Sequence, residues 1–366
     1  VVAESAKRSN DYPSTVNALE FVLAGHKNIE LPAGLFDFSA DRLWEAYSHY
    51  ALYVGNKAQY LIGDDKQWLD AAHAAEAKYP VKARSLYALI ILRGQDAAAR
   101  IKAANGFLNL MHKRKRGAEL VMRLFLKSKY FQDIKLIPAP IRYDLVDVAL
   151  SRSDIELASM LMTTIKKSPR GSDNYQWQLR RARIFILGGK AAEGSKTLQR
   201  LIEITDKFNR EQLDKFLQVV FDLQTAKEHE YAFQLFKLIS EKVEEKELQR
   251  EIFYWMADSL KAQEKFSEAA QLYLRSAYYL QEGLDPWGQT ARYQAAEMLA
   301  KADLLQDAHS LYENLLRTTK EPARRAVLKH ELQKLWLLKN ESKFSEENKL
   351  TDEDGTENTS EVNLAQ

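Results

Sequence analysis

The sequence contains no cysteine and few residues that break helices. Without cysteine the chain has no disulfide, no zinc–thiolate site, no iron–sulfur cluster and no cysteine nucleophile. Only 14 glycines and 8 prolines interrupt its 366 residues. So few turn residues argue against a sandwich or barrel of many short strands. The composition therefore favours long helices joined by short loops.

Long hydrophobic runs and strong net charge are also lacking. No stretch approaches 18 uninterrupted apolar residues, so we expect no transmembrane segment. The net charge is +2, but residues 341–366 hold eight acidic and two basic residues, which leaves the preceding body mildly basic. This balance differs from the concentrated basic surface of a dedicated nucleic-acid binder.

The first residue is Val1 rather than Met, so we expect either a removed leader or a longer parent protein. The absence of cysteine suits an oxidising compartment. These features predict a periplasmic location, with the cytoplasm as the alternative.

All eight prolines stand where helices would begin or end, because proline inside a helix costs about 3 kcal/mol. Apolar residues spaced three and four apart indicate helices with one buried face. The predicted N-terminal helices span residues 15–24, 41–62, 66–79, 81–93, 95–111 and 115–131, and a closing helix spans residues 321–338.

A repeated pattern of small and large residues fills the second half of the chain. In residues 252–277, Ala257 and Leu260 fall on a first helix and Phe266 falls at a turn. Ala269, Tyr273 and Ser276 follow on a second helix. This pattern resembles the tetratricopeptide repeat (TPR), in which small residues mark close helix crossings. The small positions recur at Ala118, Ala158, Gly194, Ala232, Ala269 and Ala308.

These positions are 36 to 40 residues apart, whereas the family's usual period is about 34. Lengthened repeats of this kind are similar to those of bacterial envelope TPR proteins. The resemblance implies an all-α fold, a TPR-like α-solenoid in which helix hairpins form a right-handed superhelix. We predict an N-terminal helical region at 1–140, made of degenerate repeats or a separate domain. Repeats with a C-terminal capping helix follow at 141–340, and a disordered acidic tail at 341–366.

The resemblance carries no catalytic residue, and a solenoid offers an extended surface rather than a reaction centre. It implies a non-catalytic scaffold that binds a peptide or partner protein through the groove lined by the first helix of each pair. The residues expected in that groove are Arg183, Phe221, Tyr254, Asp258, Lys261, Tyr293, Glu297 and Lys301. The seven histidines form no H-E-x-x-H motif and no pair at helical ligand spacing, so we expect no metal and no cofactor.

A basic cluster offers an alternative site. Lys113, Arg114, Lys115 and Arg116 are consecutive, and such a patch suits an anionic polymer or lipid surface. A solvated turn between two helices explains the same residues. A further alternative is that the chain is the helical accessory region of a larger enzyme.

Overall fold

The computed structural model describes residues 11–25, 38–61, 63–280 and 285–353, with residues 341–353 described by their backbone alone. Throughout these described ranges the regular elements are helices and no strand is present. The chain folds as two compact units, unit 1 at residues 1–190 and unit 2 at residues 191–366. This division separates two compact units. The predicted boundary at residue 140 instead separates the region with a clear repeat pattern from the region before it, and it stays a prediction.

Unit 1 is a cluster of helices whose first six starts lie within three residues of the predicted ones, whereas α3, α4 and α7 end four or five residues earlier than predicted. Asp64, Asp96 and Asp154 accept backbone N–H bonds at helix starts, and Pro80 opens a helix in its first turn. The elements are α2 (Tyr12–Gly25), α3 (Ala40–Ala58), α4 (Asp65–Ala75), α5 (Pro80–Arg93), α6 (Ala97–His112), α7 (Gly117–Leu126), the short 3₁₀ turns η1 (Lys129–Phe131) and η2 (Ile134–Leu136), α8 (Ala139–Ser151), α9 (Ile155–Thr163) and α10 (Asn174–Leu187).

An aromatic core holds the first helices of unit 1 together. The rings of Tyr47 and Phe125 pack edge-on against Trp44, and all three side chains are fully buried. The indole N–H of Trp44 donates to the Leu124 carbonyl at 3.0 Å. A buried indole needs such a partner, so α3 and α7 are joined by packing and by a hydrogen bond.

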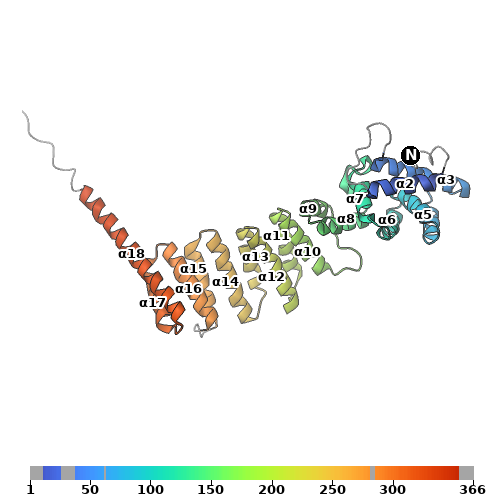
Figure 1. Ribbon diagram of the computed structural model, residues 1–366. Coiled ribbons are helices and arrows are strands. Elements are labelled where there is room, and N and C mark those ends of the chain that lie inside the picture. Colours follow the sequence, from blue (N-terminus) through green and yellow to red (C-terminus); the bar gives the residue numbers. More distant parts are fainter. Residues whose placement is uncertain (1–10, 26–37, 62, 281–284, 354–366) are drawn as a thin grey trace, which may run out of the picture. The chain divides into compact units, whose positions relative to one another are not determined.

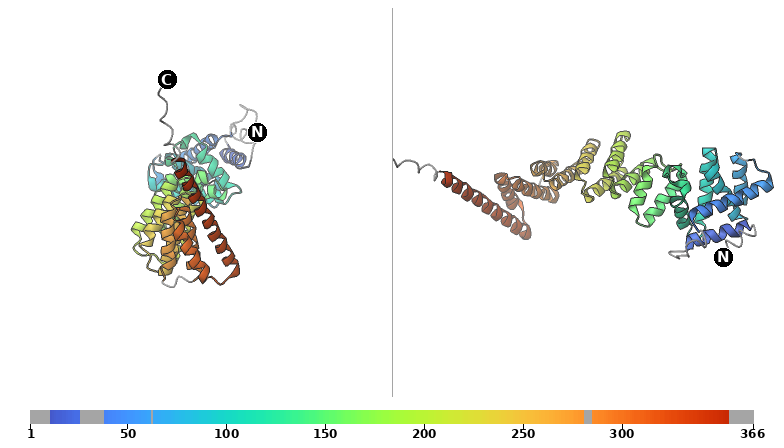
Figure 2. Two further views of the ribbon diagram at one scale, coloured as in Figure 1. Left: turned by 90° about the vertical axis from the view of Figure 1, so that its left-hand side faces the viewer. Right: turned by 90° about the horizontal axis from the view of Figure 1, so that it is seen from above.

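Unit 2 is an array in which each helix packs on the next from α13 to α18 (Figures 1 and 2). Contacts of this sequential kind make it an all-α helical repeat solenoid. Its helices are α11 (Ala191–Ile204), α12 (Arg210–Thr225), α13 (His229–Ser240), α14 (Lys246–Ala262), α15 (Phe266–Tyr278), α16 (Pro286–Lys301), α17 (Leu305–Thr318) and α18 (Pro322–Glu353).

The small residues of the predicted frame lie at the helix contacts. Ala232, Ala269 and Ala308 are fully buried on α13, α15 and α17, and Ala158 is fully buried on α9. An alanine there lets two helix backbones approach closely, which a larger side chain would prevent. Ala118, at the first position of the frame, is only partly buried.

The last helix is longer than the sequence analysis expects. α18 continues to Glu353, whereas the predicted helix ends at 338 and an acidic tail without structure begins at 341. Residues 341–353 contain no proline or glycine and include Glu, Lys and Leu, which have high helix propensity. The remainder of the predicted tail, 354–366, lies outside the described residues.

Candidate functional site

The first helices of three successive hairpins, α12, α14 and α16, lie side by side in unit 2. The Gln224 amide on α12 donates to the Trp255 carbonyl at 3.1 Å and to the Ser259 hydroxyl at 2.8 Å, both on α14. The Lys261 ammonium on α14 donates to the Gln294 side-chain oxygen on α16 at 2.8 Å. These bonds join helices that are more than 30 residues apart in sequence into one layer.

The helices of this layer carry seven of the eight predicted groove residues, and we name the surface that they are expected to form the α12–α14–α16 face. They are Phe221, Tyr254, Asp258, Lys261, Tyr293, Glu297 and Lys301. The eighth, Arg183, is exposed on α10 and belongs to unit 1, whereas the other seven belong to unit 2. The assignment of these residues to partner binding stays a prediction.

The aromatic members of the face are half-buried because each ring also packs on a neighbouring helix. The Tyr254 ring lies 5.2 Å from the Trp287 ring and 5.1 Å from the Tyr273 ring, between centroids. The Tyr293 ring lies 5.7 Å from that of Tyr312. Burial raises the pKa of Tyr254 to about 12, so its hydroxyl is neutral at physiological pH. These rings therefore support the fold as well as line the surface.

The charged members form a connected set across α14 and α16. The Glu297 carboxylate lies 3.0 Å from the Lys301 ammonium and 3.9 Å from the Lys261 ammonium. The Asp258 carboxylate accepts a hydrogen bond from the Tyr273 hydroxyl. Burial raises the pKa of Asp258, although Tyr273 and Lys261 oppose the shift. A partner would therefore meet charges of both signs held in fixed positions.

A hollow of about 470 Å³ opens beside these charges. We name it the α14–α16 hollow, and its lining is Asp258, Lys261, Ala262, Glu264, Phe266 and Lys301. The Lys301 ammonium lies 5.7 Å above the centroid of the Phe266 ring, within range of a cation–π contact. Three of the predicted residues thus border one concave feature.

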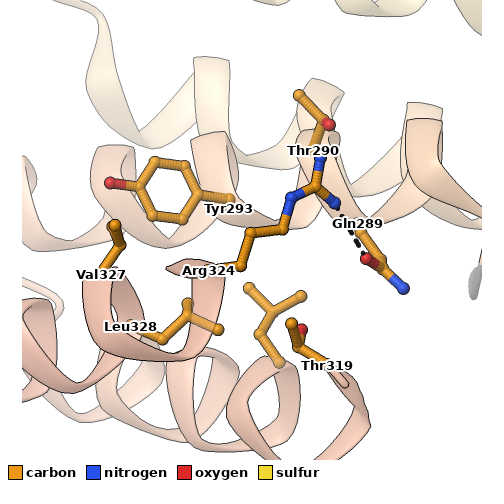
Figure 3. Close-up of a pocket in the computed structure, with 8 residues that line it drawn as sticks. Gln289, Thr290, Tyr293, Thr319, Arg324, Val327 and Leu328 are labelled. Atoms are coloured by element: carbon orange, nitrogen blue, oxygen red, sulfur yellow. Dashed lines mark hydrogen bonds between the residues drawn. The ribbon is translucent and has the colours of Figure 1, made fainter. Parts of the chain in front are cut away.

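A second concave feature, not indicated by the sequence, lies where α16 and α17 meet the start of α18 (Figure 3). This α18 pocket has a volume of about 320 Å³. Its lining is Gln289, Thr290, Tyr293, Leu315, Thr319, Arg324, Val327 and Leu328. The repeat pattern predicts Tyr293 as a groove residue, but it predicts only a capping role for the last helix. The one signal in the sequence is Val327, an apolar residue beside the core residue Leu328.

One member of the predicted basic patch, Arg114, is built into the core of unit 1. The Arg114 guanidinium lies 2.7 Å from the Glu20 carboxylate, which is fully buried and also binds Arg84 through two bonds of 2.7 Å. The Tyr47 hydroxyl donates to the same carboxylate at 2.6 Å. Burial, followed by the charge of Glu20, raises the pKa of Tyr47 well above its usual value. Arg114 therefore forms part of a buried ion network.

The rest of the basic cluster is divided between structural bonds and exposure. Arg116 donates to the Gly25 carbonyl at 2.6 Å but is exposed, as are Lys113 and Lys115. The preceding residue, His112, lies 2.7 Å from the Asp144 carboxylate. Of the four consecutive cations, three are thus exposed, and one of these three is held by a backbone carbonyl.

The described residues include no group of three or more histidines, aspartates or glutamates placed to hold a metal ion. Within the same ranges, no helix is long and apolar enough to cross a membrane.

No protein-family model matches the sequence, and no curated protein matches it either. Among solved structures, the chain is similar to yeast Tom70 at 13% sequence identity and a TM-score of 0.31, over 89% of this chain and 70% of that one. It is also similar to a circular tandem repeat protein with a novel repeat topology, at 14% identity and a TM-score of 0.17, over 91% of this chain and 86% of that one. Neither likeness bears on the function of this chain.

Proposed function

We propose that the chain is a non-catalytic scaffold that binds a segment of another protein on the α12–α14–α16 face. The observation that carries this proposal is the joining of α12, α14 and α16 into one layer. That layer presents half-buried aromatic rings and paired charges beside the α14–α16 hollow. Preformed sites of this kind, with few but fixed polar groups, suit recognition of a peptide or partner surface.

The finer identity of the fold belongs to the same proposal. The buried small residues Ala232, Ala269 and Ala308 support a TPR-type repeat, because they occupy the positions that the resemblance assigns to close helix crossings. We further propose a bacterial envelope location, supported by the lengthened repeats and the absence of cysteine. Fractionation of the native host tests the location, and recovery in the cytosolic fraction would contradict it.

Changing Lys261 and Lys301 together to Ala is expected to weaken partner binding at least tenfold, because both ammonium groups border the hollow at a surface held rigid by neighbouring helices. The measurement is affinity capture from native extract with the full chain, followed by titration of the captured protein. Lysines are preferable to Tyr254 and Tyr293 as targets, since those rings pack on other helices.

The matched control changes Arg200 and Lys237 to Ala. Both are exposed cations, but they lie on α11 and α13, the second helices of their hairpins. The control is expected to bind like the unaltered chain. If the two double variants retain the same material and added salt releases it from both, the exposed lysines of the basic cluster become the leading site. If no protein is retained, the scaffold proposal fails.

A further inference from the structure

The α18 pocket combines apolar walls with a polar rim. Leu315 and Leu328 form its floor at 2% and 4% exposure, and the Tyr293 ring and Val327 form its sides. Val327 is 48% exposed, so its apolar side chain at the pocket wall is accessible to a partner. The volume of the α18 pocket, about 320 Å³, is at the lower end of the range for ligand pockets, which begins at about 300 Å³. The space suits one large side chain of a partner better than a cofactor.

The Arg324 guanidinium stands at the rim of this pocket (Figure 3). It lies 3.2 Å from the Gln289 side-chain oxygen and 3.2 Å from the Glu321 carboxylate. The Arg324 side chain is 50% exposed and that of Glu321 is 60% exposed, so this ion pair is weak and easily exchanged. Arginine has five N–H donors, so the guanidinium can donate hydrogen bonds to a further carboxylate.

The turn that leads into α18 is strongly basic. Residues 317–325 contain Arg317, Lys320, Arg324 and Arg325 against the single acid Glu321. Arg325 is held by the carbonyls of Leu316 and Thr319 at 2.6 and 3.0 Å, which fixes one of these charges in place. A segment entering the pocket beside this turn would be favoured if it carried negative charge.

We propose that the α18 pocket anchors an aliphatic or aromatic side chain of a partner segment whose adjacent residues are acidic. This inference rests on the proposed scaffold function and names the chemistry of the segment that the face takes. The apolar side chain fills the space between Tyr293, Val327 and Leu328. The acidic neighbour pairs with Arg324 in place of Glu321.

The pocket is continuous with the α12–α14–α16 face through α16. Thr290, Tyr293, Glu297 and Lys301 are spaced three and four residues apart, so they lie on one side of the helix. Thr290 lines the α18 pocket and Lys301 lines the α14–α16 hollow. Eleven residues of helix separate them, which is about 16 Å, or the length of roughly five residues of extended chain. One short segment therefore reaches both.

The test selects randomised twelve-residue peptides on the full chain and measures the affinity of enriched peptides by fluorescence anisotropy. We expect the enriched peptides to share a large apolar residue with Asp or Glu within two positions. Val327→Glu is expected to weaken binding at least tenfold, because it places a carboxylate at the pocket wall. The matched control Ala326→Glu makes the same change at an exposed neighbour that does not line the pocket, and it is expected to leave affinity within about twofold. Arg324→Gln is expected to remove the preference for acidic residues.

Three results would overturn the inference. The first is enrichment without the apolar–acidic pattern, or no enrichment at all. The second is that the Val327→Glu variant binds the enriched peptide as tightly as the unaltered chain does. If the Lys261 and Lys301 double variant still loses affinity for the same peptide, the scaffold proposal stands and only the pocket assignment fails. The third is preferential binding of a synthetic peptide of residues 354–366, which would make the occupant this protein's own acidic end rather than a partner.

Discussion

Replacing Glu20 with Gln is expected to lower the free energy of unfolding of unit 1 by about 3–5 kcal/mol. The Glu20 carboxylate is fully buried and balances Arg84, whose side chain is only 3% exposed. Neutralising the carboxylate leaves the Arg84 guanidinium charged without a counter-ion in a water-free site, and arginine does not give up its proton. Arg114, at 26% exposure, can turn toward solvent, so Arg84 accounts for most of the loss.

Hydrogen exchange measured peptide by peptide checks this prediction, because it reports each unit separately. Protection of α2 and α5 is expected to fall by two to three orders of magnitude, since each 1.4 kcal/mol is a factor of ten, while unit 2 is unchanged. The double variant Glu20→Met with Arg84→Met is expected to be less unstable than the Glu20→Gln single variant. A loss below about 1 kcal/mol for Glu20→Gln would mean that water enters the site and screens the charges.

Replacing Arg250 with Met is expected to destabilise unit 2 by about 3 kcal/mol, because it removes charged hydrogen bonds from a buried position. The guanidinium makes two bonds of 2.6 Å to the Asp285 carboxylate, and its Nε donates to the Ser276 carbonyl at 3.1 Å. Asp285 also caps α16 by accepting from the Gly288 backbone N–H at 3.0 Å. One side chain on α14 therefore fixes the end of α15 and the start of α16.

The same contact predicts a defined pH dependence. Hydrogen bonding from Arg250 lowers the pKa of Asp285, so the folded chain holds the carboxylate ionised to lower pH than the unfolded chain does. The stabilisation is complete above the usual aspartate pKa of about 3.9 and is lost as the pH falls below it. Urea unfolding followed by circular dichroism measures the free energy of unfolding of the unaltered chain and of the Arg250→Met variant. The difference between the two free energies should become smaller below about pH 4. A difference that stays constant down to pH 3 would contradict this assignment.

Much of the fold of unit 2 follows from sequence because its determinants are local. The spacing of small residues specifies where helices cross, and the structure buries Ala269 and Ala308 at those crossings. Helix starts in unit 1 are local in the same way. Proline and aspartate there act through the backbone within one turn, and the predicted starts of α4 and α5 lie within one residue of the observed ones. Propensity also explains why α18 extends beyond the predicted end at residue 338, since Glu and Lys favour the helical backbone.

The parts of the candidate site that sequence did not reveal depend on distant contacts. In the sequence, Arg114 is one of four consecutive basic residues. In the structure it pairs with Glu20, which lies 94 positions earlier in the chain. The α18 pocket requires knowledge of how the capping helix sits on α16 and α17, which no local pattern specifies. The face on α14 and α16 was predictable because residues three and four apart share a side of a helix.

Photo-crosslinking in the native host tests the central claim most directly. A photoreactive phenylalanine analogue placed at Ala262, an exposed residue that lines the α14–α16 hollow, is compared with the same analogue at Lys237 on α13. We predict a discrete adduct with a protein partner from position 262 that is absent from position 237 and is lost when Lys301 is changed to Ala. An adduct from position 237 alone, or identical adducts from both positions, would contradict partner binding on the α12–α14–α16 face.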